Sequence, residues 1–403
     1  MSRQAQKTVR RRRVFYIPGY DPFHPRRYRE LYRKESAAQA AISGYDIKLR
    51  PAPGTARFGW QVTAQIDGIE VDTSFEVLTW SDIVKQSMDL NIPMTYLMLA
   101  RTAWIYIGTG AIFRLVKMRK GPVIAAFYPV VVLLLQLILS IGLSLGLGAL
   151  AAFVHAFAFW PVTLVAFVFL MRWFRQIDNR IFAYYLMLDY AYSGCARGAT
   201  PPELVIRIAE FVEEITAALQ SDVDEVLVVG HSSGAHIGVS VLADLLAAGA
   251  VPADGPALSF LTLGQVVPMV SFLPDADVLR RDLHAMAGQE QVPWVDVSAP
   301  GDGCAFALCD PVSVSGVAPE NKRWPLVFSA AFTQSLSAAR WKALRWRFFR
   351  LHFQYLCAFD RPRDYDYFQI TAGPRTLGER YAGRPPSRSR IQKPLSAYRT
   401  MAP

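Results

Sequence analysis

A stretch of 51 residues without a single Lys, Arg, Asp or Glu, Gly121 to Met171, constrains this chain more than any other feature. One helical crossing of a bilayer takes about 20 residues, so the stretch is too long for one span and suits two. We expect a tight turn near Gly142, Gly146 and Gly148. The sequence therefore predicts a transmembrane helical hairpin over 121–171. The alternative is an unusually apolar helical pair buried in a water-soluble domain.

Both flanks of this stretch are basic. Four cations precede it and three follow: Arg114, Lys117, Arg119 and Lys120, then Arg172, Arg175 and Arg180. Positive flanks stay on the cytoplasmic side, so we expect a bacterial inner-membrane protein whose main domain faces the cytoplasm. A eukaryotic organelle membrane is the alternative. The net charge of +10 lies largely in the tails and beside the hairpin, which suits a bilayer with anionic headgroups as partner.

The region before the hairpin, 97–120, is apolar, but we do not predict that it crosses the membrane. Arg101 and Arg114 leave only 12 uncharged residues between them, too few to cross. We interpret the region as a helix lying in the membrane interface or as a lid over an active site.

Other partners and cofactors are not indicated. The four cysteines, Cys195, Cys304, Cys309 and Cys357, have no metal-ligand spacing, and we expect them to be reduced and structural. We recognise no nucleic-acid-binding motif, so nucleic acid is not an expected partner. No metal and no cofactor is predicted.

Strand and helix patterns outside the hairpin predict an α/β fold. Candidate strands are 14–17, 46–50, 60–66, 69–78, 225–229, 257–263 and 293–297, and the late ones alternate with helical stretches such as 201–219. That alternation is typical of a mostly parallel sheet flanked by helices. We divide the chain into a basic disordered arm (1–13), a first domain part (14–96), the region 97–120, the hairpin (121–171), a second domain part (172–360) and a basic disordered tail (361–403).

The segment 225–236 carries the clearest chemical signal. An apolar strand runs into Gly230-His-Ser232-Ser-Gly234 and then into a helical stretch. This is the nucleophile-elbow pattern, in which glycines two before and two after the serine allow a sharp turn that exposes its hydroxyl. Ser232 is therefore the candidate nucleophile. The alternative is a tight turn with a buried structural serine.

A serine nucleophile needs a histidine base held by a carboxylate. His352 is the histidine downstream of the last candidate strand, and Asp302 lies in the loop after that strand. We rank Asp302 first as the acid and Asp310 second, because Asp296 falls within the strand. Each acid could instead be a turn-forming residue.

The tetrahedral intermediate needs two donors for its negative charge, usually backbone amides. We assign the amide of Ser233 and the amide of Tyr20, which follows the first strand in Pro18-Gly19-Tyr20. An ordinary Pro-Gly turn is the alternative for the second donor.

The chain resembles the α/β-hydrolase superfamily, particularly its lipase-like serine esterases. The resemblance is carried by the strand and turn at 14–20, the elbow, the strand ending at Gly264, the Asp302 loop and His352. The resemblance covers roughly 14–80 and 185–360. It implies a Ser-Asp-His esterase with an inserted membrane hairpin. The first loop differs, because the family often has His-Gly where this chain has Pro18-Gly19.

We therefore expect a membrane-anchored serine hydrolase that cleaves an acyl ester, and the anchor favours a lipid ester. Two alternatives remain open: a tethered scaffold that keeps the fold without turnover, and an acyltransferase in which an alcohol replaces water.

Overall fold

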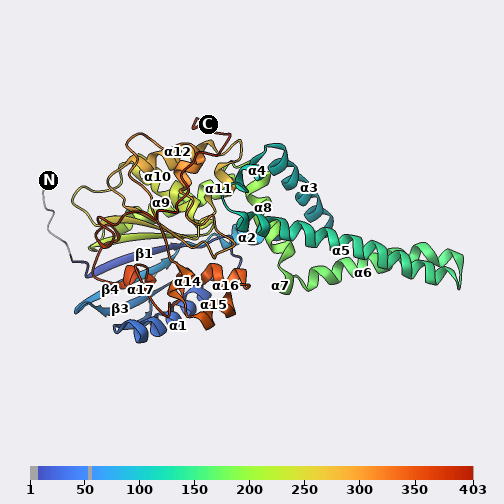
Figure 1. Ribbon diagram of the computed structural model, residues 1–403, viewed down its shortest axis with the longest axis horizontal. Coiled ribbons are helices and arrows are strands. Elements are labelled where there is room, and N and C mark those ends of the chain that lie inside the picture. The colour runs from blue at the N-terminus through green and yellow to red at the C-terminus, as the bar shows by residue number, and fades with distance from the viewer. Residues whose placement is uncertain (1–7, 53–56, 403) are drawn as a thin grey trace.

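Eight strands form one sheet in the part of the chain that the computed structural model describes, residues 8–52 and 57–402 (Figure 1). Their order across the sheet is β2-β3-β4-β1-β5-β6-β7-β8. From β4 through β1 to β8 neighbours are parallel, whereas β2, β3 and β4 pair antiparallel. The strands are β1 (Arg11–Ile17), β2 (Asp46–Pro51), β3 (Gly59–Ile66), β4 (Ile69–Val77), β5 (Glu225–His231), β6 (Ala257–Leu263), β7 (Trp294–Ser298) and β8 (Leu326–Ser329). The predicted α/β class with a mostly parallel sheet is confirmed.

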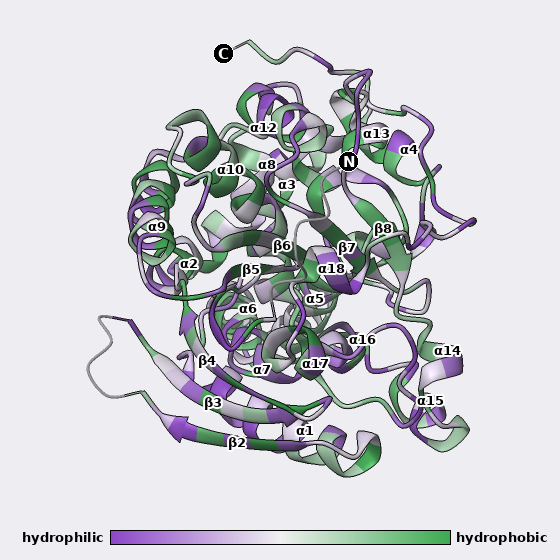
Figure 2. Ribbon diagram, turned by 90° about the vertical axis from the view of Figure 1, so that its left-hand side faces the viewer, coloured by the Kyte–Doolittle hydropathy of each residue, from purple (hydrophilic) through white to green (hydrophobic). Residues whose placement is uncertain are grey.

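Hydrophobic patterning explains where these strands lie. Every residue of β5 is buried because helices cover both faces of a parallel sheet. Figure 2 shows the central strands as mainly hydrophobic, while the outer strands β2 and β3 carry hydrophilic segments. The turn between β3 and β4 is Asp67-Gly68, with φ of 54° and 76°, as expected for a two-residue hairpin.

Helices cover both faces of the sheet and bury two large apolar clusters. In Figure 1, α9, α10 and α12 lie above the sheet, and α1 and α14 to α17 lie below it. The helices of the domain are α1 (Arg26–Ser43), α2 (Ser81–Met88), α3 (Ile92–Gly108), α4 (Ala111–Leu115), α7 (Asp178–Ile181), α8 (Ala183–Cys195), α9 (Pro202–Leu219), α10 (Gly234–Ala247), α11 (Val267–Ser271), α12 (Asp277–Gly288), α13 (Pro311–Ser315), α14 (Phe332–Ser335), α15 (Ala338–Leu344), α16 (Phe348–His352), η2 (Phe353–Leu356), α17 (Tyr367–Ala372) and α18 (Leu377–Arg380).

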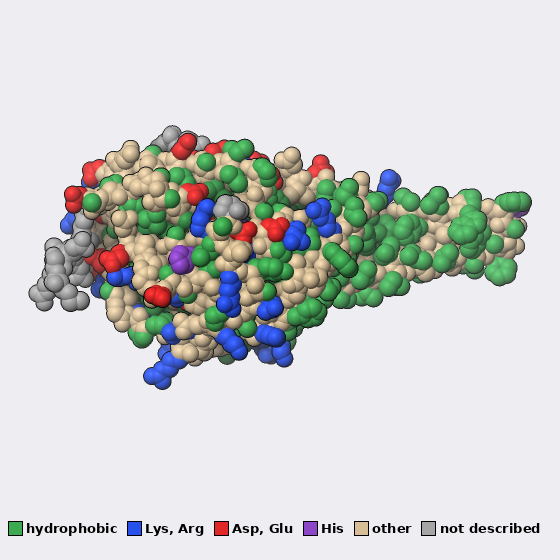
Figure 3. Space-filling model, turned by 90° about the horizontal axis from the view of Figure 1, so that it is seen from above, with side chains coloured by type: hydrophobic (Ala, Val, Ile, Leu, Met, Phe, Trp, Pro, Cys, Tyr) green, Lys and Arg blue, Asp and Glu red, His purple; other side chains and the backbone are tan. Residues whose placement is uncertain are grey.

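Two long helices, α5 (Lys120–Ala152) and α6 (Phe159–Gln176), protrude from the domain as an antiparallel pair (Figure 1). Both are long and apolar enough to cross a membrane, and only 22% and 11% of their apolar windows is buried. Figure 3 shows the pair covered with hydrophobic side chains. So much exposed apolar surface does not fit the alternative of a buried helical pair, and it suggests membrane association.

The turn of this hairpin lies later than predicted. Residues 153–158, with the short helix η1 (Ala156–Ala158), join the two helices, and the three glycines lie inside α5. A Cβ on Gly148 would lie 2.0 Å from Thr163 Oγ1 and 2.8 Å from the Phe159 carbonyl oxygen. Glycine is therefore required there for close helix packing, a common role in membrane helices, and does not mark a turn.

The ends of the chain also differ from the prediction. Arg11 to Arg13 belong to β1, and Arg12 forms a fully buried ion pair of 2.6 Å with Glu225, so they are not part of a disordered arm; residues 1–7 lie outside the described residues. The expected disordered tail packs on the domain: Tyr365 and Phe368 enter one core cluster, and Met401 packs against the other. The Arg12 guanidinium also donates to the carbonyl oxygens of Gly373 and Arg375.

The region 97–120 forms the end of α3, then α4, beside the hairpin base. Leu99 and Ile105 are buried, but Leu97, Trp104 and Phe113 are exposed, Trp104 by 78%. The interfacial interpretation remains a prediction.

Strands β1 and β5 lie next to each other, with Arg12 opposite Glu225 and Ile17 opposite Gly230. The chain segments before and after the hairpin therefore share one sheet. If the hairpin enters a membrane, the number of crossings must be even.

Candidate active site

Ser232 sits at a sharp turn between β5 and α10. Its φ of 57° is in the left-handed region, which non-glycine residues rarely adopt outside constrained sites. A Cβ on Gly230 would lie 2.7 Å from the Gly234 carbonyl oxygen, and one on Gly234 would lie 2.1 Å from that of Ile17. Both glycines are needed so that the strand, the turn and β1 can approach. The geometry is that of an elbow that presents the half-exposed Ser232 at the carboxyl edge of the sheet.

Asp302 and His352, which are 50 residues apart in the chain, meet in the structure. His352 Nδ1 lies 2.7 Å from Asp302 Oδ2, and both side chains are buried. Asp302 follows β7, and His352 ends α16, beyond β8. A proton on Nδ1, donated to the carboxylate, leaves Nε2 as the free basic nitrogen. Nε2 is buried and has no partner among the described residues.

Gly264, directly after β6, connects this pair with the elbow. The Ser232 amide donates to the carbonyl oxygen of Leu263, 3.0 Å away. A Cβ on the next residue, Gly264, would lie 3.1 Å from His352 Cε1 and 3.3 Å from Asp302 Oδ2. The three predicted residues Ser232, Asp302 and His352 therefore gather around the carboxyl ends of β5 and β6. The structure shows no hydrogen bond between Ser232 and His352.

Asp302 is held in its ionised form. Burial alone would raise its pKa, but the nearby His352 and the donors around the carboxylate outweigh burial and lower it. These donors are the Cys304 amide, 2.9 Å from Oδ1, and the Tyr355 hydroxyl, 3.0 Å from Oδ2. Tyr355 in turn accepts from the Ala299 amide. Tyr355, three residues after His352 in η2, was not assigned from the sequence.

The other acids that we weighed have different tasks. Asp310 caps α13 by accepting from the amides of Val312 and Ser313, and it pairs with Lys322 at 2.5 Å. Asp296 lies within β7, where it accepts from Thr262 and where burial raises its pKa to about 7. Neither is hydrogen-bonded to a histidine in the described structure.

The loop Pro18-Gly19-Tyr20 lies against Ser232. A Cβ on Gly19 would be 2.9 Å from Ser232 Cβ. Trp80 Nε1 donates to the Pro18 carbonyl oxygen at 3.0 Å, and the Tyr185 hydroxyl donates to that of Tyr20. The loop's carbonyl groups are thus held by side chains of the domain.

The two predicted oxyanion donors have no competing acceptor. Within residues 8–52 and 57–402, neither the Tyr20 amide nor the Ser233 amide donates to a protein acceptor. Ser233 precedes α10, so its amide also lies at the positive end of a helix. Both amides are available to an oxygen bound near Ser232.

His231 supports the segment that carries His352. Its Nε2 lies 3.0 Å from the His352 carbonyl oxygen, to which it donates, and the two rings lie 4.7 Å apart. Burial and the neighbouring His352 lower the pKa of His231 to about 3, so it is neutral at physiological pH.

A further carboxyl group, Asp189, was not identified from the sequence. It lies on α8 between Tyr185, which donates to the Tyr20 carbonyl, and Tyr192, whose ring centre is 5.8 Å from that of Tyr20. Residues 185, 189 and 192 share one helix face, so Asp189 faces the site. Burial raises its pKa to about 7, and the nearby His352 lowers it by a smaller amount.

Asp302, Cys304 and His352 are also close enough to be considered as metal ligands, since their ligand atoms lie within 4.8 Å of one another. However, burial and the neighbouring carboxylates raise the pKa of Cys304 well above its usual value, and only a thiolate is a strong ligand. Asp302 and His352 already bind each other. The arrangement fits an acid–base pair better than a metal site.

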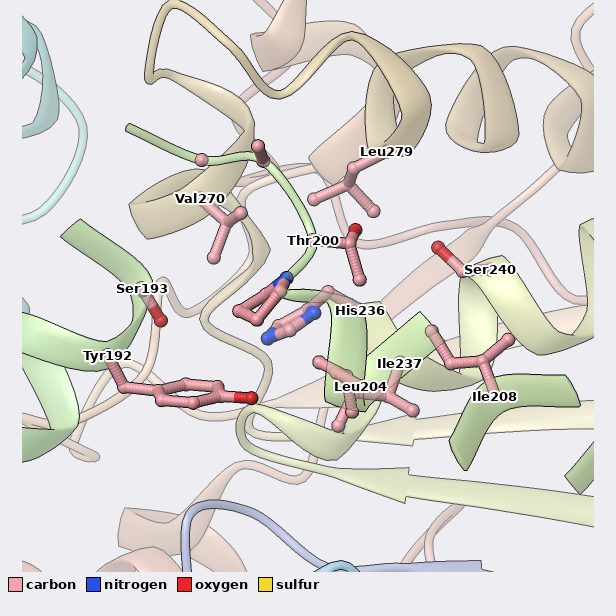
Figure 4. Close-up of a pocket in the computed structure, with 13 residues that line it drawn as sticks. Tyr192, Ser193, Thr200, Leu204, Ile208, His236, Ile237, Ser240, Val270 and Leu279 are labelled. Atoms are coloured by element: carbon pink, nitrogen blue, oxygen red, sulfur yellow. The ribbon is translucent and has the colours of Figure 1, made fainter. Parts of the chain in front are cut away.

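A small cavity behind the elbow is separate from this pair. His236, Thr200, Tyr192 and Ser240 line it together with apolar side chains (Figure 4). Burial lowers the pKa of His236 to about 4, so the cavity holds a neutral imidazole. Neither Ser232 nor His352 lines this cavity.

Comparison of the chain with protein-family models, curated proteins and solved structures finds no match. The case for its function therefore depends on the geometry of the site.

Proposed function

We propose that this protein is a membrane-anchored serine hydrolase of the α/β-hydrolase type that cleaves an acyl ester. The observation that carries the proposal is the Asp302–His352 pair, whose buried and unpartnered Nε2 lies at the edge of the sheet where the elbow presents Ser232. Supporting it, the order Ser, Asp, His along the chain is the order of that superfamily. The proposal is also supported by the sheet order, in which β1, followed by the loop 18–20, is the neighbour of β5, followed by Ser232.

In this mechanism His352 Nε2 removes the proton of Ser232 as its oxygen attacks the ester carbonyl carbon. Asp302 holds the imidazole in the required tautomer and stabilises the imidazolium. The amides of Tyr20 and Ser233 bind the oxyanion, and His352 then protonates the departing alcohol. Water, activated by the same histidine, releases the acid from the acyl-enzyme.

The hairpin supports a lipid ester as the substrate and the cytoplasmic face of a bacterial inner membrane as the location. It would hold the site close to the bilayer, and its basic flanks favour the cytoplasmic side.

A fluorophosphonate probe tests the proposal on the full chain in detergent. We expect the wild type and Ser233→Ala to be labelled and Ser232→Ala not to be, because Ser233 contributes only its amide. Asp302→Asn should slow labelling by roughly three to four orders of magnitude. Failure to label folded wild type would favour the scaffold alternative. Product analysis with a competing alcohol separates hydrolysis from acyl transfer.

A further inference from the structure

Helices α15 and α16, with the link between them, form an exposed basic and aromatic surface. From Asn321 to Phe359 the chain has no acidic residue. Lys342, Arg345, Arg347 and Arg350 are exposed, and in the described structure their side chains form no ion pair. Trp346 and Phe348, between these cations, are 73% and 49% exposed. We call these six side chains the α15–α16 surface.

This surface lies beside the base of the hairpin. A Cβ on Gly303 would lie 3.1 Å from the Phe348 ring, and one on Gly121, at the start of α5, would lie 3.1 Å from the Gly303 Cα. On the other side, the ring of Phe349 lies 5.1 Å from that of Phe182, which follows the return helix of the hairpin. In Figure 1, α16 lies next to α7. Residues of α16 therefore lie near the start of α5, through Gly303, and near the chain that follows α6.

Its chemistry matches the headgroup region of a bilayer. Exposed Trp and Phe side chains are favoured at membrane interfaces, and clustered Lys and Arg side chains bind anionic lipid headgroups. Four cations that form no ion pair with the described residues would be unfavourable next to a neutral surface but favourable next to a negative one.

We infer that the α15–α16 surface binds anionic phospholipid headgroups of the membrane that holds the hairpin. The inference rests on the proposed function only in giving the site a membrane setting. It goes beyond that function by making activity depend on the lipid composition of the membrane. The link to the site is direct, because α16 ends at His352 and Trp341 of α15 packs on Gly301, next to Asp302.

Hydrogen exchange tests this without turnover. Full-length Ser232→Ala is placed in nanodiscs of phosphatidylcholine alone or with about one third phosphatidylglycerol, and the amides of 338–352 are followed. We expect phosphatidylglycerol to slow their exchange and about 0.5 M salt, which shortens the screening length to a few ångströms, to abolish the effect. Arg345→Glu/Arg347→Glu should exchange roughly tenfold faster in the anionic discs.

The matched control is Lys48→Glu/Arg50→Glu, two exposed cations on the edge strand β2, and it should keep the protection. Equal exchange in both lipids, or protection that survives Arg345→Glu/Arg347→Glu, would overturn the inference. So would equal protection by a soluble single-stranded oligonucleotide in phosphatidylcholine discs, which would indicate a nucleic-acid surface. If the lipid protects these amides but the fluorophosphonate never labels the wild type, the proposed hydrolase function is rejected and the lipid-binding surface is retained.

Discussion

Gly264 shows how one missing side chain lets the site form. The strand β6 ends one residue before it, and its φ of 54° turns the chain away so that His352 and Asp302 can pack against the bare Cα. The Tyr355 ring is even closer, 2.7 Å from where a Cβ would be. The absence of a side chain at Gly264 thus allows Asp302 and His352 to lie close to the turn that carries Ser232.

We expect Gly264→Ala to lower the rate of fluorophosphonate labelling by about a hundredfold, since displacing catalytic groups by about 1 Å costs this much. Gly249→Ala is the control, because Gly249 also has a positive φ, 64°, but nothing within 4 Å of a Cβ. Both variants place an alanine at a positive φ, but only Gly264→Ala adds a side chain beside Asp302 and His352. Equal labelling of the two would show that Gly264 has no role in assembling it.

Asp189 gives a prediction about pH. Its pKa of about 7 lies above the value of about 3.9 for an unfolded Asp, so the native state binds a proton that the unfolded state has lost. The free energy of unfolding should therefore fall as pH rises from about 4 to 7. In Asp189→Asn this fall should be smaller, and the melting temperature at pH 8 should exceed that of wild type by several degrees.

Melting curves of both proteins between pH 5 and 8 measure this. Asp296, whose pKa is also raised to about 7, is present in both, so the difference reports Asp189 alone. Parallel curves for the two proteins would contradict the prediction.

At the scale of elements, the sequence was informative where one pattern dominates. The apolar runs at 225–229 and 257–263 predicted β5 and β6 because a parallel strand is buried on both faces. Strand β8 was missed because Leu326–Ser329 is only four residues long and has no periodicity to detect. The tail was misjudged because its Arg, Pro and Ser content hides Tyr365, Phe368 and Leu377, which contact the core only in three dimensions.

The same distinction holds in the candidate site. The elbow is a local pattern and could be found from five residues, and chain order placed Asp302 and His352. Tyr355 and Asp189 were not assigned. The role of Tyr355 depends on its hydrogen bond to Asp302, and that of Asp189 on its nearness to Tyr20 in the folded protein.

The packing of α5 on α6 can be tested at Gly148. Alanine favours a helix over glycine by about 1 kcal/mol, so Gly142→Ala, with nothing within 4 Å, should keep or raise the melting temperature in detergent. Gly148→Ala should lower it, because its Cβ would overlap Thr163 Oγ1. Adding Thr163→Ala should restore part of the loss, since that hydroxyl has no partner in the described structure. A Gly148→Ala protein as stable as Gly142→Ala would mean that α5 and α6 do not pack closely here.

At the scale of the whole molecule, the sheet constrains how many times the chain can cross a membrane. Strands β1 and β5 are hydrogen-bonded neighbours, so the chain must return to the side from which it left. The 33 residues of α5 extend about 50 Å, more than the roughly 30 Å hydrocarbon core, and therefore can carry the turn to the far side. Val154, in that turn, is 90% exposed.

We therefore expect Val154→Cys, expressed in a bacterial host, to react with a membrane-impermeant maleimide in cells whose outer membrane has been permeabilised. Ser389→Cys, on the exposed domain surface, should react only after the inner membrane is broken. Wild type, with its four native cysteines, gives the background in both conditions. Reaction of Ser389→Cys in unbroken cells would place the domain outside the cytoplasm and refute the orientation derived from the basic flanks. It would leave the even number of crossings intact, because that number follows from the sheet and the orientation follows from the charges.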